Sequence, residues 1–127
     1  MKAKFLSVLL ALTMVLSLLP TAVLAKDKTV STEEELKQAI ESVSDGDTIT
    51  VSGTIEVNAP LVVTHTITLT GGSIVASNNF TSNSNQLADF NLISLKTAGK
   101  TLTLKNITLN ANGKSLVVYC NAGKVVV

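Results

Sequence analysis

The chain has few of the residues that enzymes use for chemistry. Its 127 residues include no Arg and no Trp, one His (His65) and one Cys (Cys120), and the only acid beyond Glu56 is Asp89. Most glycoside hydrolases need two carboxyl groups flanking the scissile bond, and zinc needs three or four His, Cys or acidic ligands in one place. The sequence therefore predicts no catalytic residue, no cofactor and no metal site.

The scarcity of cysteine and of net charge argues against two further classes of protein, those stabilised by disulfides and those that bind nucleic acid. One cysteine cannot form a disulfide within the chain, and its place in the apolar run from Leu116 to Cys120 predicts a small buried side chain with no redox role. Without residues 1–25 the chain has 102 residues, eight Lys against nine acids, and a formal charge of −1. We expect no nucleic-acid partner from this balance.

The N-terminus has the pattern of an export signal. Lys2 and Lys4 precede an apolar stretch over residues 5–19, and Pro20 is followed by Val23-Leu24-Ala25, a small-residue cleavage pattern. The apolar stretch is shorter than the roughly 20 residues that span a bilayer, which favours cleavage over an uncleaved anchor. We predict a signal peptide at 1–25 and an extracellular, secreted or cell-wall-associated mature domain at 26–127.

One helix is predicted over residues 31–43. Apolar residues at 36, 39, 40 and 43 have helical spacing, and the first turn holds three acids, which suit the positive end of the helix dipole. Either Ser31 with Glu34 or Thr32 with Glu35 fits a capping box. The segment 44–47 then ends the helix and turns the chain.

From Thr48 the apolar period changes to two, which is typical of strands with one buried face. Near copies of one phrase occur at 48–51, 54–57, 66–69 and 101–104, and looser strands are predicted at 73–75, 91–95, 107–109, 116–119 and 125–127. The phrase returns after 18 residues and again after 35, which favours a parallel solenoid with coils of about 20–25 residues. An antiparallel sandwich is the alternative.

In such a solenoid, the first coil would be capped by the predicted helix and the last coil would have no cap. The predicted helix is placed to cover the first coil, whereas the chain stops in the apolar run from Lys124 to Val127 with no cap after it. We therefore expect the N-terminal portion of a longer polypeptide, truncated at the C-terminus. We also expect the uncovered strands near Val125 to cause self-association.

The remaining candidate residues have structural interpretations that compete with functional ones. An Asn/Ser-rich segment at 77–86 is too polar for a strand stack and predicts a surface loop, on which Phe80 is either a sugar-stacking ring or a hydrophobic plug. His65 is predicted to be exposed beside a strand. Asp45 and Asp47 fit a turn better than a Ca²⁺ site. The sequons at Asn79 and Asn106 are interpreted as coincidental, because the leader at 1–25 is of bacterial type.

Two segments resemble a known family. Residues 35–51, with Leu36, Ala39-Ile40 and Gly46-Asp47-Thr48-Ile49, are similar to the opening of right-handed parallel β-helix proteins of the pectin-lyase-like superfamily. Residues 102–110 resemble a coil found in cell-surface β-helix proteins of Gram-positive bacteria. The resemblance implies an all-β, right-handed parallel β-helix with an N-terminal capping helix. It also implies that Asn106 occupies a tight bend with left-handed backbone angles, where its amide bonds along the stack.

The resemblance is specific for fold and weak for activity. The superfamily includes polysaccharide lyases and hydrolases, but no stretch matches their catalytic motifs, so no catalytic residue is carried over. The function expected is a non-catalytic scaffold or adhesion surface, with a polysaccharide, other glycan, or host or matrix surface protein as partner. The alternative is the N-terminal fragment of a polysaccharide lyase or glycoside hydrolase whose active site lies beyond residue 127.

Overall fold

The computed structural model describes residues 24–82 and 90–127. The predicted leader at 1–25 therefore lies, except for Leu24 and Ala25, outside the described residues, as does the part of the Asn/Ser-rich segment at 83–86. None of the helical segments in these two ranges has the length and hydropathy of a membrane span.

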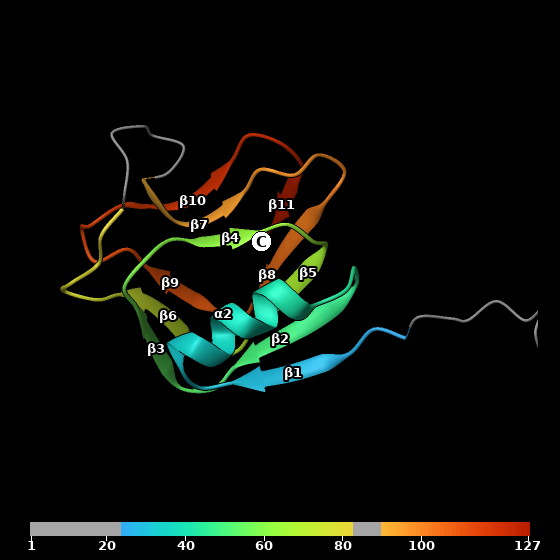
Figure 1. Cartoon of the computed structure of the whole chain (residues 1–127), viewed down its shortest axis with the longest axis horizontal. Helices are drawn as coiled ribbons and strands as arrows, with labels where there is room; N and C mark the ends of the chain where they lie inside the picture. Colours follow the sequence, from blue (N-terminus) through green and yellow to red (C-terminus); the bar gives the residue numbers. More distant parts are fainter. Residues whose placement is uncertain (1–23, 83–89) are drawn as a thin grey trace, which may run out of the picture.

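The described chain consists mostly of short strands in parallel sheets, with one short helix (Figure 1). The elements, in chain order, are β1 (Asp27–Val30), α2 (Glu33–Ser42), β2 (Asp47–Val51), β3 (Thr54–Val57), β4 (Leu61–Val63), β5 (Ile67–Thr70), β6 (Ser73–Ala76), β7 (Asn91–Leu95), β8 (Thr101–Lys105), β9 (Thr108–Asn110), β10 (Leu116–Cys120) and β11 (Lys124–Val126).

Strands that lie side by side are never hairpin neighbours in this part of the chain. The three sheets have the orders β1-β2-β5-β8-β11, β10-β7-β4 and β3-β6-β9, and every pairing is parallel. Each of three successive triplets, β2-β3-β4, β5-β6-β7 and β8-β9-β10, thus contributes one strand to each sheet. The alternative of an antiparallel sandwich is wrong.

The register refines the predicted repeat. Thr48 lies beside Thr68, an offset of 20 residues, and not beside Thr66 as the phrase comparison suggested. The difference of two residues leaves the inward face unchanged, because side chains alternate with period two. The second interval agrees with the prediction: Ile67 lies beside Leu102, an offset of 35 that includes the segment 77–90.

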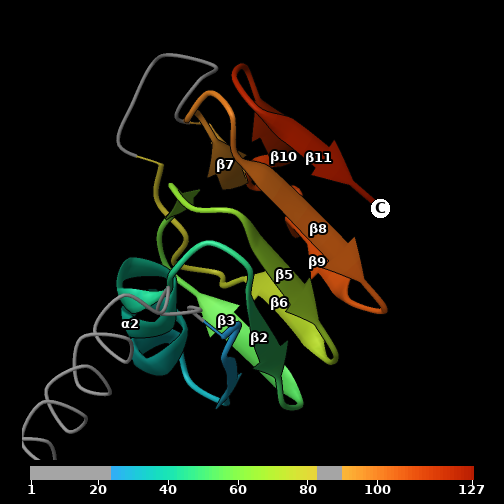
Figure 2. The ribbon, with the colours of Figure 1, turned by 90° about the vertical axis from the view of Figure 1, so that its right-hand side faces the viewer.

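The helix covers the end of the stack that begins with β1 (Figure 2). Its buried residues are Leu36, Ala39 and Ile40, and it contacts β1, β2, β3 and β4. The cap is the Thr32–Glu35 alternative: Thr32 Oγ1 accepts the Glu35 N–H at 3.2 Å, and Glu35 Oε2 accepts the backbone N–H of Ser31 at 2.8 Å. The reciprocal bond thus reaches one residue further back than in the usual capping box.

Two strands were missing from the prediction. The residues of β1 show no alternating pattern, and β4 has only three residues, Leu61, Val62 and Val63. Both are defined by their partners: β1 continues the ladder of β2, and β4 pairs with β7. Segments this short are too short to show an alternating sequence pattern. They become strands because they pair with a neighbouring strand in the tertiary structure.

Candidate functional site

The outer face of the five-stranded sheet carries aligned threonines. Thr48 lies beside Thr68, which lies beside Thr103, and in a parallel column Thr50 lies beside Thr70. These side chains are partly exposed, while the residues between them point inward and are buried. Neighbouring strands are about 4.8 Å apart, so the hydroxyls form a closely spaced array. Each hydroxyl can both donate and accept a hydrogen bond.

Opposite charges border the two threonine columns. Asp27 of β1 lies beside Thr48, and Lys105 of β8 lies beside Thr70. Between them the two columns contain only neutral hydroxyl side chains on β2 and β5. The two columns can therefore form many neutral hydrogen bonds, and the charged side chains beside them are Asp27 and Lys105.

A hydrogen-bonded ladder supports one side of this face, where each sheet strand begins. Asp45 Oδ1 accepts the backbone N–H of Thr66 at 2.8 Å, and Thr66 Oγ1 accepts the backbone N–H of Thr101 at 3.1 Å. Lys100 Nζ donates to Asp45 Oδ2 at 2.6 Å. The Lys100 ammonium, followed by the Thr66 N–H, lowers the pKa of the Asp45 carboxyl. The ladder joins the segments that precede β2, β5 and β8.

Asp47 serves as a turn residue, in agreement with the interpretation that favoured a turn over Ca²⁺. Its side chain is buried; Oδ2 accepts the Ser44 N–H at 2.9 Å and Oδ1 accepts the Lys26 N–H at 2.8 Å. These two hydrogen bonds, that from Ser44 first, lower the pKa of Asp47. Throughout residues 24–82 and 90–127, no three His, Cys, Asp or Glu side chains are grouped to hold a metal.

The aromatic candidate is buried. Phe80 is 8% exposed and belongs to the hydrophobic core, and its N–H donates to the Ser77 carbonyl at 3.1 Å. Phe80 is therefore the plug of the two alternatives, and the sugar-stacking interpretation is wrong. The exposed ring is instead Phe90, at 39%. No local sequence signal separates these two rings, because each follows a polar or acidic stretch.

The prediction of a buried Cys120 is wrong, because the side chain is exposed. Cys120 lies beside the fully buried Leu95, so its position in the sheet is an inward one. However, β10 is the last strand of its sheet, and no described strand lies beyond it. The thiol lies 3.7 Å from the carbonyl oxygen of Ala122.

His65 and Asn106 have local roles. His65 is partly buried, where exposure was predicted, and its Nδ1 lies 3.1 Å from Thr64 Oγ1. Asn106 joins β8 to β9 with φ of 49°, which confirms the predicted left-handed bend. A hydrogen bond from its amide along the stack is not among those formed by the described residues.

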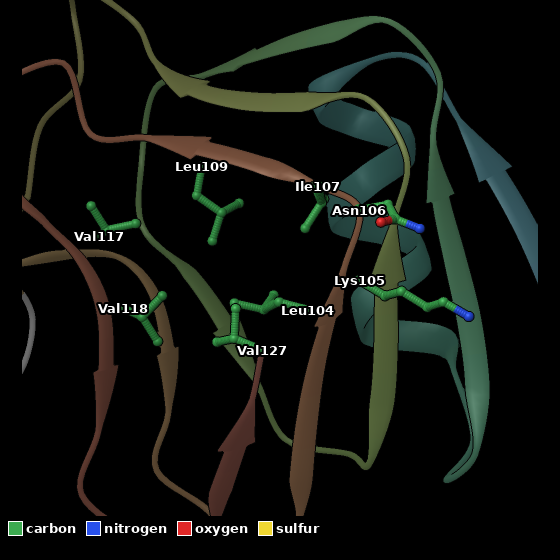
Figure 3. A pocket seen from close by; sticks show the side chains of 8 residues that line it. All are labelled: Leu104, Lys105, Asn106, Ile107, Leu109, Val117, Val118 and Val127. Atoms are coloured by element: carbon green, nitrogen blue, oxygen red, sulfur yellow. The ribbon is translucent and has the colours of Figure 1, made fainter.

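An apolar hollow lies at the end of the stack away from the helix. It has a volume of about 450 Å³ and is lined by Leu104, Lys105, Asn106, Ile107, Leu109, Val117, Val118 and Val127 (Figure 3). Figure 3 shows the aliphatic side chains pointing into it, with the Lys105 ammonium directed away. The lining is mostly aliphatic, and its two polar side chains are those of Lys105 and Asn106.

Comparisons with protein-family models, curated proteins and solved structures find no match to this chain.

Proposed function

We propose that this chain is an exported, right-handed parallel β-helix domain similar to those of the pectin-lyase-like superfamily. The recurrence of strand triplets across three parallel sheets supports a coiled path. The handedness rests on the strong preference of parallel crossover connections for the right hand. Export rests on the predicted signal peptide, and places the domain outside the cell or on its wall.

We propose further that the domain is a non-catalytic scaffold whose threonine face binds polysaccharide. The observation that carries this proposal is the pair of aligned columns containing Thr48, Thr68 and Thr103, and Thr50 and Thr70. A flat series of hydroxyls at strand spacing complements the hydroxyls of an extended sugar chain without strong charge. The turn role of Asp47 and the structural role of Asp45 leave these acids engaged in holding the fold.

Binding can be tested by affinity electrophoresis in gels that contain neutral or acidic polysaccharides. We expect retardation of the protein, and loss of most of the retardation in Thr68→Val/Thr103→Val, because valine keeps the shape and removes the hydroxyl. The matched control is Thr54→Val/Thr108→Val, which changes two exposed threonines on the β3-β6-β9 sheet. Equal retardation of both double variants would refute the threonine face as the site.

The enzyme alternative has a separate readout. Incubation of the protein with polygalacturonate and Ca²⁺ should give no unsaturated product absorbing in the ultraviolet. Steady product formation by the purified chain would overturn the non-catalytic assignment. Binding to matrix proteins without binding to any polysaccharide would retain the scaffold but change its partner.

A further inference from the structure

Asp47, the first residue of β2, is a buried carboxylate with no cationic side chain paired to it. It is 3% exposed, and its two oxygens accept the backbone N–H groups of Ser44 and Lys26 at 2.9 and 2.8 Å. Among the ion pairs formed within residues 24–82 and 90–127, none includes Asp47. Burial of a carboxylate is costly, and neutral N–H donors compensate for it less than a cation does.

The Lys26 nitrogen is held beside Asp47 by the sheet. The carbonyl oxygen of Lys26 accepts the Thr48 N–H at 2.9 Å, and β1 continues in register beside β2 from the next residue onward. The two preceding residues, Leu24 and Ala25, are exposed and form no hydrogen bond within the described part of the chain. The contact between Lys26 and Asp47 therefore does not depend on the residues that precede it.

The predicted leader ends at Ala25, so its removal changes the chemistry of this same nitrogen. Hydrolysis breaks the Ala25–Lys26 peptide bond. The oxygen of the water goes to the Ala25 carboxylate, and its two hydrogens go to the Lys26 nitrogen, which becomes an ammonium at neutral pH. The ordinary pKa of an α-amino group is about 7.7–8.0.

We propose that removal of the leader converts the hydrogen bond between Lys26 and Asp47 into an ion pair, formed by the new α-ammonium and the buried carboxylate, which stabilises the mature fold. A charge-assisted hydrogen bond is roughly twice as strong as a neutral one. The ion pair fixes the start of β1 against β2. This inference rests on the proposed export and on cleavage after Ala25, and it is independent of glycan binding by the threonine face.

The surroundings favour an ionised Asp47. The N–H groups of Ser44 and Lys26, followed by the ammoniums of Lys28 and Lys26, lower the pKa of its carboxyl. On the β5 side its register partner is the apolar Ile67. The titratable side chains on and before β1, in the last turn of α2, in the turn before β2 and just before β5 are Lys26, Asp27, Lys28, Glu41, Asp45 and His65.

The α-amino group is thus the member of the pair that titrates above neutral pH. A neighbouring carboxylate raises the pKa of an amine, because it favours the charged form. The added stability is therefore present below the ordinary α-amino pKa, and it is lost as the pH rises through the raised value.

The first test measures the pKa of the α-amino group in the exported protein, from the pH dependence of its acylation rate followed by mass spectrometry of the N-terminal peptide. We expect a pKa raised by about one unit above the ordinary value, and an ordinary value in Asp47→Asn. Asp45→Asn is the matched control, since Asp45 lies on the same turn but accepts from Thr66 and Lys100, and it should leave the pKa raised. An ordinary pKa in the unmodified exported protein would overturn the ion pair.

A second test remains decisive if Asp47→Asn does not fold. One extra alanine between Ala25 and Lys26 lets the exported chain begin one residue earlier, so that the Lys26 nitrogen is again a neutral amide. This form should melt about 4 °C or more below the unmodified exported protein at pH 7, and the two should converge near pH 10. Equal melting temperatures at pH 7 would overturn the proposal.

N-terminal sequencing of the exported protein separates this inference from the proposed export. A chain that stays in the cell with its leader would overturn the export, and the ion pair with it. A chain that is exported and begins at Lys26, but has an ordinary α-amino pKa, would overturn the ion pair alone.

Discussion

The end of the strand stack that α2 covers follows the same alternating pattern as the opposite end, formed by β9, β10 and β11, which we call the open end. The two ends differ in burial. Ile74 of β6 is fully buried, whereas its direct neighbour Leu109 of β9 is only partly buried. Likewise Ile93 of β7 is fully buried and its neighbour Val118 of β10 is not. The comparison shows that an inward position is buried only when a further strand or helix lies over it.

Within the third triplet the same difference occurs strand by strand. Leu102 of β8 is fully buried, and Val125 of β11 lies beside it. β9 and β10 have no such neighbour among the described strands, and their inward residues are accordingly more exposed. Burial at this end is therefore decided by one short strand of three residues.

The largest effect is expected from truncating neighbours in one inward column. Ile74→Ala should lower the free energy of unfolding by about 2–5 kcal/mol, since it leaves a cavity between packed strands. Leu109→Ala should cost about 1 kcal/mol, because its side chain is already partly exposed. Urea denaturation of both variants measures the difference. Equal losses would mean that the open end is covered in solution.

A smaller effect is expected at the bends between strands. Gly72 has φ of +34°, and an added Cβ would clash with the Gly53 carbonyl oxygen, whereas a Cβ at Gly113, with φ of +67°, would have no atom within 4 Å. Both alanine variants incur the left-handed strain of about 1–2 kcal/mol. Only Gly72→Ala adds a clash with backbone, so its melting temperature should fall further than that of Gly113→Ala. Equal melting temperatures would contradict the close approach of the two bends.

Removal of the helix cap should lower the free energy of unfolding by a smaller amount. Thr32→Ala removes the oxygen that accepts the Glu35 N–H and should cost about 1 kcal/mol. Because α2 covers β1 to β4, the loss should appear as faster hydrogen exchange at the covered end, with unchanged exchange in β8. Glu34→Ala is the control, since Thr32 and Glu35, not Glu34, form the cap. Uniform acceleration across the sheet would contradict a local role.

The smallest effect concerns pH. The pKa values of Asp45 and Asp47 are lowered by folding. Both carboxylates therefore stabilise the fold at pH values above the ordinary Asp pKa of about 3.9. This contribution is lost as the pH falls through their folded-state pKa values, since the unfolded chain then binds protons more readily. Asp47→Asn should therefore flatten the acid side of a plot of melting temperature against pH. An unchanged slope would contradict the turn role of the carboxylate.

The sequence predicted much of the fold but little of the site. The helix, the alternation from Thr48 onward and the parallel arrangement followed from period and spacing. The exposure of Cys120 did not, because it depends on whether a further strand lies beside β10. The plug role of Phe80 was one of two alternatives that the sequence left open. The strands β1 and β4 were missed because three or four residues are too few to show a period.

What the sequence by itself determined is which side chains of each strand point inward, since alternation is a property of the extended backbone. Only the tertiary structure decided which inward positions are buried, which threonines form columns, and which edges stay open. These depend on register and on neighbours along the stack, and such contacts join residues that are 20 to 35 positions apart.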